Sequence, residues 1–251
     1  MTMQPSASPQ TRYLKDYQPP AYLIDRVELL FDLFEQGSRV LSRLQMRPNP
    51  AGQGGPLVLD GEGLKTLSLT LDGKALSEGD YQLAASSLTL AVPEQPFLLE
   101  TEVEIAPESN TALEGLYRSS GMFCSQCEAE GFRRISWYLD RPDVMAPFRV
   151  RIQADKARYP VLLSNGNPTA SGDLPDGRHF AVWDDPFAKP CYLFALVAGD
   201  LAFIEDHHRT ASSREVRLRI YVEPQNLDKC DHAMQSLRKA MAWDEQQYGR
   251  E

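Results

Sequence analysis

The sequence predicts a mainly β fold, namely an antiparallel sandwich or saddle-like domain followed by a short segment that combines strand and helix. Three observations predict it. Alternating apolar and polar runs return about every ten residues with short turns between them, which is typical of antiparallel domains. Asp72-Gly73 joins two alternating runs, which is a strong hairpin signal. Near the end, one alternating run leads into one amphipathic helical pattern.

The strands are expected where apolar residues alternate or cluster between Gly, Pro, Asn and Asp residues. The run from Cys191 to Val197 is apolar on both faces and predicts a buried central strand. A loop rich in Gly and Pro, 48–56, interrupts the pattern. The predicted strands cover 22–24, 27–33, 39–46, 57–59, 67–71, 81–83, 87–92, 97–105, 148–154, 161–164, 179–183, 191–197 and 216–222.

The last strand is followed by a predicted helix. Pro224 ends the strand, Asn226 is a good N-cap, and Gly249 is the expected C′ residue. The apolar stripe of the helix comprises Leu227, Cys230, Met234, Leu237, Met241 and Tyr248. One strand and one helix are too little to bury that stripe as an independent domain. Either the helix docks on the β-domain, or the chain is the front part of something larger.

Composition is that of an ordinary soluble globular protein. The 251 residues are 42% hydrophobic and 24% charged, and the formal net charge of −9 argues against a nucleic-acid or anionic-membrane partner. Residues 1–18 are polar, which predicts a mobile tail and no signal peptide. No apolar run approaches the ~20 residues of a membrane span. Four cysteines do not make a disulfide scaffold, so a cytoplasmic location is expected.

The sequence carries no complete signature of a metal or nucleophile site. Cys124 and Cys127 form a Cys-x-x-Cys, but a tetrahedral zinc needs about four ligands and no second pair exists. The context is a β-loop rather than the helix N-terminus of a thioredoxin-like site, so structural cysteines are favoured. None of the four histidines begins an H-E-x-x-H, and neither a G-x-S-x-G nor a phosphate-binding glycine run is present.

The densest polar cluster is the segment 125–134, which contains Gln126, Glu128 and Glu130. Three interpretations are open: a metal or redox site, a solvated acidic loop, and a pocket that grips a cationic group. A solvated loop is usual for carboxylates, but the apolar and aromatic residues on either side indicate that this loop is packed. Side chains two residues apart on an extended backbone point the same way, so Gln126 and Glu128 can together accept two N–H donors of an ammonium group.

At these residues the chain resembles aminopeptidase N of the bacterial type, a family of zinc metallo-aminopeptidases. The similar segments follow in family order essentially from Tyr13 to the end. Three of them are Gln-Cys-Glu-Ala-Glu-Gly-Phe at 126–132, Tyr-Leu-Asp-Arg-Pro-Asp-Val at 138–144 and Trp-Asp-Glu at 243–245. Others lie at 110–117, 163–167, 185–187, 189–200 and 216–222.

The resemblance implies a tail over 1–12, an N-terminal β-domain over 13–199 and the start of a truncated thermolysin-like α/β catalytic domain over 200–251. It implies that Gln126 and Glu128 help to hold the free α-ammonium of a peptide substrate, and that this part of the protein forms one wall of the S1 pocket. It also implies a cis peptide bond between Glu128 and Ala129.

The G-A-M-E-N segment and the H-E-x-x-H of the family are absent from the chain. The resemblance therefore implies zinc in the full-length family member, but no metal ligand or catalytic residue here, no zinc bound by this chain, and no peptide hydrolysis by the chain alone. The expected partners are the N-terminus of a peptide substrate and the missing catalytic domain. The alternative is a non-catalytic β-sandwich module that binds peptide N-termini or a partner protein.

Overall fold

The computed structural model describes residue 11 and residues 13–251, and it is built mainly of strands, which confirms the predicted fold class. The predicted tail of residues 1–12 lies outside the described residues, apart from Thr11. The polar residues that follow are folded. A 3-10 turn, η1 (Leu14–Asp16), leads to Tyr17, whose hydroxyl donates a hydrogen bond to Asp143 at 2.9 Å.

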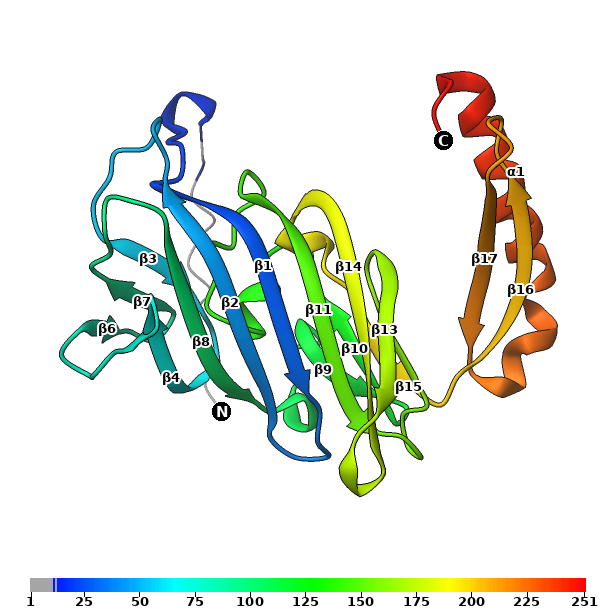
Figure 1. The fold of residues 1–251 in the computed structure, drawn as a ribbon, viewed down its shortest axis with the longest axis horizontal. Coiled ribbons are helices and arrows are strands. Elements are labelled where there is room, and N and C mark those ends of the chain that lie inside the picture. Colours follow the sequence, from blue (N-terminus) through cyan, green and yellow to red (C-terminus); the bar gives the residue numbers. More distant parts are fainter. Residues whose placement is uncertain (1–10, 12) are drawn as a thin grey trace.

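The largest sheet has eight strands and extends across the β-domain (Figure 1). Its strands pair antiparallel, except that β1 and β11 run parallel to each other. Buried and partly exposed residues alternate along its long strands, so one face is packed and the other is open. From edge to edge the strands are β13 (Asn167–Asp173), β14 (Arg178–Pro190), β11 (Met145–Asp155), β1 (Tyr22–Asp32), β2 (Ser38–Pro48), β8 (Phe97–Ile105), β4 (Lys65–Leu71) and β5 (Lys74–Ala75).

Two smaller sheets complete the β-domain. The four-stranded sheet has the order β12 (Val161–Ser164), β15 (Leu196–Gly199), β10 (Met122–Gln126) and β9 (Gly115–Ser119). The three-stranded sheet has the order β3 (Leu57–Asp60), β7 (Ser87–Leu90) and β6 (Tyr81–Leu83). The connecting 3-10 turns are η2 (Pro107–Ser109), η3 (Phe132–Arg134), η4 (Pro175–Gly177) and η5 (Cys191–Leu193).

Aromatic side chains join the large sheet to the segments that cover it. Phe194 stacks on Phe31 of β1 with 5.7 Å between ring centroids, and it meets Phe132 of η3 at 5.4 Å. Phe132 in turn lies 4.7 Å from Tyr138. All four rings are buried. The polar segment therefore contributes to the core on its inner side, as its flanking aromatic residues indicated.

The predicted strand over 191–197 is shorter than expected. Residues Cys191–Leu193 form η5, because the N–H of Phe194 bonds to the carbonyl of Cys191 at 3.0 Å and closes a turn. This turn directs both Cys191 and Phe194 into the core. The strand β15 begins only at Leu196, although it is an inner strand of its sheet, as predicted.

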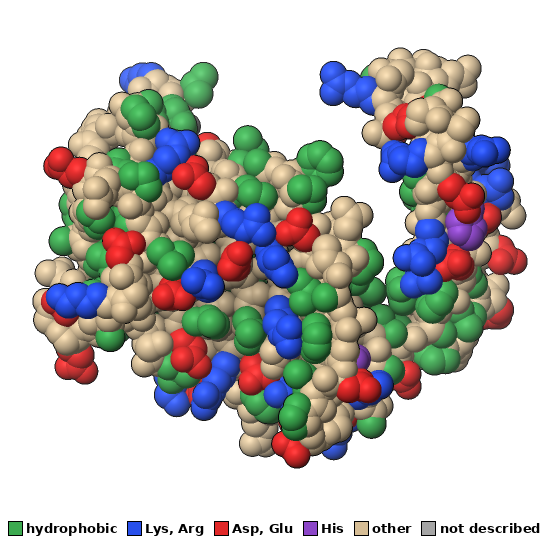
Figure 2. All heavy atoms as spheres, in the orientation of Figure 1, with side chains coloured by type: hydrophobic (Ala, Val, Ile, Leu, Met, Phe, Trp, Pro, Cys, Tyr) green, Lys and Arg blue, Asp and Glu red, His purple; other side chains and the backbone are tan. Residues whose placement is uncertain are grey.

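The end of the chain forms a separate unit, which Figure 1 shows standing apart from the β-domain. It consists of the hairpin β16 (Ala202–Arg209) and β17 (Glu215–Val222), the 3-10 segment η6 (Pro224–Lys229) and the helix α1 (Asp231–Tyr248). The sequence predicted only the second of these strands. The helix packs on both strands of the hairpin, and the space-filling view shows an open gap between the upper part of this unit and the β-domain (Figure 2).

The helix begins at Asp231, four residues later than the N-cap predicted at Asn226 implies. The side chain of Asn226 bonds to Glu223 at 3.3 Å and to Lys229 at 2.7 Å instead of capping a helix. Gly249 is confirmed as the C′ residue, with φ of 62°. Of the apolar stripe, Cys230 and Met234 are buried, whereas Leu237 and Tyr248 are exposed. Within the described residues, no helix has the length and apolar character needed to cross a membrane.

Candidate functional site

The candidate site is the loop that follows strand β10. The strand ends at Gln126, and the chain turns through 127–131 before η3. The peptide bond between Glu128 and Ala129 is cis, which confirms the sequence prediction. The N–H of Gly131 bonds to the carbonyl of Cys127 at 2.8 Å and closes the turn. A Cβ at Gly131 would lie 2.4 Å from the carbonyl oxygen of Gln126, so this turn requires glycine.

Gln126 and Glu128 both lie on the exposed side of the loop. The side-chain amide nitrogen of Gln126 donates to the carbonyl oxygen of Glu128 at 3.2 Å. Because a carbonyl oxygen can only accept, this bond fixes the orientation of the amide and leaves its Oε1 as an acceptor. Among the described residues, no hydrogen bond or salt bridge engages the Glu128 carboxylate. Glu130 differs, because Arg133 pairs with its carboxylate at 3.4 Å.

Arg133 connects the loop to a buried carboxylate. Asp140 is 5% exposed, and its Oδ2 accepts from the backbone nitrogen of Arg133 at 3.2 Å and from Nε at 2.8 Å. Burial alone would lower the pKa of Arg133, but the hydrogen bond to Asp140 raises it, so the guanidinium stays charged. The Oδ1 of Asp140 accepts from the Cys191 thiol at 3.0 Å. Sequence reasoning missed this contact between distant segments.

Arg134 fixes the other side of η3. It bonds to Glu62 at 2.6 Å and to Glu114 at 3.3 Å. Gly115 begins β9 with φ of +71°, and a Cβ there would lie 2.7 Å from the Cβ of Arg134. The two consecutive arginines therefore connect the loop to different segments: Arg133 to Asp140, and Arg134 to Glu62 and Glu114. The density of charge in 125–134 indicated such pairs, but the partners Glu62 and Glu114 have no sequence signal.

The cysteines beside the loop have the surroundings of structural thiols. Burial raises the pKa of Cys127 to about 12, and burial also raises the pKa of Cys191. A thiol that is protonated at neutral pH is a poor nucleophile and a poor metal ligand. In the part of the chain that the structure describes, no group of three or more His, Cys, Asp or Glu side chains is arranged to hold a metal ion. These residues therefore do not fit a zinc ion.

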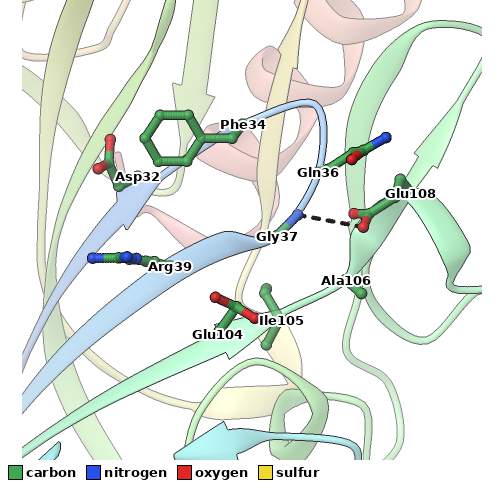
Figure 3. A pocket seen from close by; sticks show the side chains of 9 residues that line it. All are labelled: Asp32, Phe34, Gln36, Gly37, Arg39, Glu104, Ile105, Ala106 and Glu108. Carbon is green, nitrogen blue, oxygen red and sulfur yellow. Dashed lines mark hydrogen bonds between the residues drawn. The ribbon is translucent and has the colours of Figure 1, made fainter. Parts of the chain in front are cut away.

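A hollow outside this loop lies where the β1–β2 hairpin meets the end of β8 (Figure 3). It has a volume of about 670 Å³ and carries four charged side chains that already have partners. Asp32 pairs with Arg178 at 2.6 Å, Glu104 with Lys65 at 2.9 Å, and Arg39 with Glu102 at 3.8 Å. Glu108 accepts from the backbone nitrogen of Gly37, which is the dashed line in Figure 3. The hollow is a weaker candidate than the loop.

The loop has the chemistry of a cation-binding site. It presents the Glu128 carboxylate, which has no partner among the described residues, and the oriented amide oxygen of Gln126, on a backbone that buried aromatic side chains and two arginines hold in place. Such a pair suits a small group that donates several hydrogen bonds and carries positive charge. The loop belongs to the β-domain, and the hairpin β16–β17 with the helix α1 forms a separate unit at the end of the chain.

Comparison with known proteins shows the family of the chain. Residues 56–193 match the family model of the Peptidase M1 N-terminal domain, and the chain belongs to this peptidase family. It is 52% identical to aminopeptidase N of Caulobacter vibrioides over 97% of this chain. It is 48% identical to aminopeptidase N of Escherichia coli over 100% of this chain. In both cases it spans 28% of the relative.

Solved structures show the same fold. The crystal structure of Legionella pneumophila aminopeptidase A in complex with aspartic acid matches with a TM-score of 0.91 and 38% identity, over 96% of this chain and 28% of that chain. An M1 zinc metallopeptidase from Deinococcus radiodurans matches over 82% of this chain with a TM-score of 0.68 and 18% identity, which shows the fold alone. The predicted family resemblance is confirmed, and the family includes zinc peptidases. The roles of Gln126 and Glu128 stay predictions.

Proposed function

We propose that the chain is the substrate-anchoring part of a zinc-dependent aminopeptidase, and that Gln126 and Glu128 hold the α-ammonium group of a peptide. One observation supports this most directly. Glu128 offers an exposed carboxylate without a partner among the described residues, whereas Arg133 engages the carboxylate of Glu130, two residues away. A carboxylate that forms no pair within its own domain is available to a ligand.

The chemistry of a peptide N-terminus suits this pair of side chains. The α-amine has a pKa of roughly 7.7–8, so it is largely protonated near neutral pH. An ammonium group donates up to three hydrogen bonds, of which the Glu128 carboxylate and the Gln126 amide oxygen can accept two. The bond to the carboxylate is charge-assisted and therefore stronger than a neutral one. Only a chain terminus supplies this group, so the anchor selects exopeptidase substrates.

The loop also forms one wall of the S1 pocket in this proposal, and the opposite wall belongs to the catalytic domain. Hydrolysis requires a polarised carbonyl and an activated water, which a zinc ion supplies in such enzymes. Because the described residues hold no group that fits a metal ion, we expect the chain alone to be inactive. Zinc-dependent release of alanine from an alanyl anilide by the purified chain would show that this is wrong. The four free cysteines support a cytoplasmic location.

A binding experiment with two matched variants tests the anchor. The chain is titrated with a short peptide amide that has a free N-terminus, and chemical shifts of the loop amides report the binding. We expect Glu128→Gln to weaken binding about tenfold, because it keeps the shape but removes the charge. The control is Glu130→Gln, which alters a carboxylate already paired with Arg133, and its affinity should stay within about twofold. Equal effects of the two substitutions would contradict the proposed role of Glu128.

A further inference from the structure

We propose that Asp140 is a positioning residue, which acts through Arg133 to hold the 126–131 loop in the shape that presents Gln126 and Glu128. This inference rests on the function proposed above and adds a residue to the anchor that never touches the ligand. Asp140 is unusually buried for a charged residue. The side chain of Asp140 has a relative exposure of 1%, and that of its partner Arg133 has 21%.

Asp140 joins three segments that are distant in the sequence. Its Oδ2 holds η3 through the backbone nitrogen and the Nε of Arg133. Its Oδ1 accepts from the thiol of Cys191 at the start of η5. Its backbone nitrogen donates to Asp60, at the end of β3, at 3.2 Å. A buried carboxylate with three donors is fixed in position, and it can therefore serve as the reference point for the loop.

Arg133 transmits this position to the loop. Arg133 follows Gly131 by two residues. The bond from its backbone nitrogen to Asp140 therefore fixes the backbone directly after the turn. Its guanidinium also reaches back to the Glu130 carboxylate at 3.4 Å. The pairing has an electrostatic consequence. With Glu130 held by Arg133, Glu128 is the one glutamate of the loop that no described residue engages, and an incoming ammonium group meets a single acceptor carboxylate.

The charge of Asp140 is needed as well as its shape. An asparagine at this position would keep one oxygen acceptor, but it would remove the buried counter-charge of the partly buried Arg133 guanidinium. Among the described residues, Arg133 would then keep Glu130 as its only paired carboxylate, and the end of the turn would lose a charge-assisted bond. We therefore expect the loop to loosen while the aromatic core beneath it stays intact.

The test uses the 251-residue chain with the substitutions Asp140→Asn and Arg133→Lys. The control is Asp143→Asn, which breaks the pair of Asp143 with Arg141 (2.7 Å) in the same segment but away from the loop. The first readout needs no ligand. It is hydrogen exchange of the Gly131 amide, whose bond to Cys127 closes the turn. The second readout is the affinity for the free-amine peptide amide, measured well below the unfolding temperature.

We expect exchange at Gly131 to accelerate about tenfold in Asp140→Asn and Arg133→Lys and to change less than about twofold in the control. The affinity for the peptide should fall about tenfold in the same two variants. Unchanged exchange at Gly131 would overturn the inference. Faster exchange with unchanged affinity would also overturn it, because Asp140 would then have a purely structural role. If one variant does not fold, the other decides.

The two proposals fail in different ways. If the unsubstituted chain does not distinguish a free amine from an acetylated one, the anchor proposed for Gln126 and Glu128 is wrong. Exchange at Gly131 then decides alone whether Asp140 positions the loop. If the unsubstituted chain binds the free amine and both variants bind it equally well, the anchor stands and the role of Asp140 is wrong.

Discussion

Two glutamates of one loop have the same chemistry but different surroundings. Glu130 is paired with Arg133, whereas the carboxylate of Glu128 has no partner among the residues that the structure describes. This difference cannot be predicted from the sequence, because either side chain lies within reach of an arginine in the pattern Glu-x-Glu-x-x-Arg-Arg. In the folded chain, Arg133 binds Asp140 at 2.8 Å and Glu130 at 3.4 Å.

Glycine at position 131 is a steric requirement of the loop. The backbone there has an ordinary φ of −83°, but a Cβ would lie 2.4 Å from the carbonyl of Gln126. We expect Gly131→Ala to lower the free energy of unfolding by about 1–3 kcal/mol, because the turn must open to accept the methyl group. Urea denaturation measures it. The control is Gly79→Ala, where a Cβ would meet nothing within 4 Å. Equal stability of both variants would contradict the described loop.

Because of its buried thiol and phenol groups, we expect the folded chain to lose stability at alkaline pH. Burial raises the pKa of Cys127 from 9.0 to about 12, and burial with a bond to Glu35 raises that of Tyr159 from 10.0 to about 12. Above pH 9 the folded chain therefore holds more protons than the unfolded chain, and its stability falls as the pH rises towards about 12. Urea denaturation at pH 8 and 10.5 checks this decline, and Cys127→Ala should make it shallower. An equally steep decline in that variant would exclude Cys127 as a cause.

At the scale of elements, the helix α1 depends on its contacts with the β16–β17 hairpin. Two carboxylates form polar links: Glu245 bonds to His208 and to the backbone nitrogen of Ala211, each at 3.2 Å, and Asp206 of β16 pairs with Arg238 of the helix at 2.9 Å. The side chains of His208 and Glu245 are 11% and 15% exposed. The apolar stripe contributes only in part, since Leu237 and Tyr248 are exposed.

We expect Glu245→Ala to loosen the helix from the hairpin, because it leaves the Ala211 N–H and the His208 ring without their acceptor at a cost of about 1–3 kcal/mol. Hydrogen exchange of the α1 amides measures this loosening directly. Asp244→Ala is the matched control, because Asp244 is the exposed neighbour on the same helix. Faster exchange in α1 in both variants would indicate a loss of helix propensity and not the loss of the Glu245 contacts.

The sequence predicted most strands of the large sheet, because their alternation records which face is buried. It missed the β9–β10 hairpin, although Ser120-Gly121, with φ of 50° and 84°, marks its turn. The many polar residues of 106–131 hid the alternation there. The start of α1 was misplaced because Asn226 had closer partners in Glu223 and Lys229. Gln126 and Glu128 could be named from the family resemblance, but the contacts of Asp140 with Arg133 and Cys191 require the folded chain.

At the scale of the whole molecule, the chain has two parts, and it passes from one to the other directly after β15. The β-domain carries the loop on a rigid aromatic core, and the hairpin–helix unit stands beside it with apolar side chains exposed (Figures 1 and 2). The chain spans 28% of the aminopeptidase N sequences that it matches. The role proposed for the β-domain is to hold the N-terminus of a peptide at the 126–131 loop.

The most direct test of this account is a paired titration of the unsubstituted chain. One peptide amide has a free N-terminus, and its partner is identical except for an N-acetyl group, which removes the positive charge and two of the three N–H donors. We predict that the free peptide binds at least about tenfold more tightly and shifts the loop amides around Gln126 and Glu128. Equal affinities, or shifts that avoid this loop, would contradict the claim that these residues anchor the α-ammonium group.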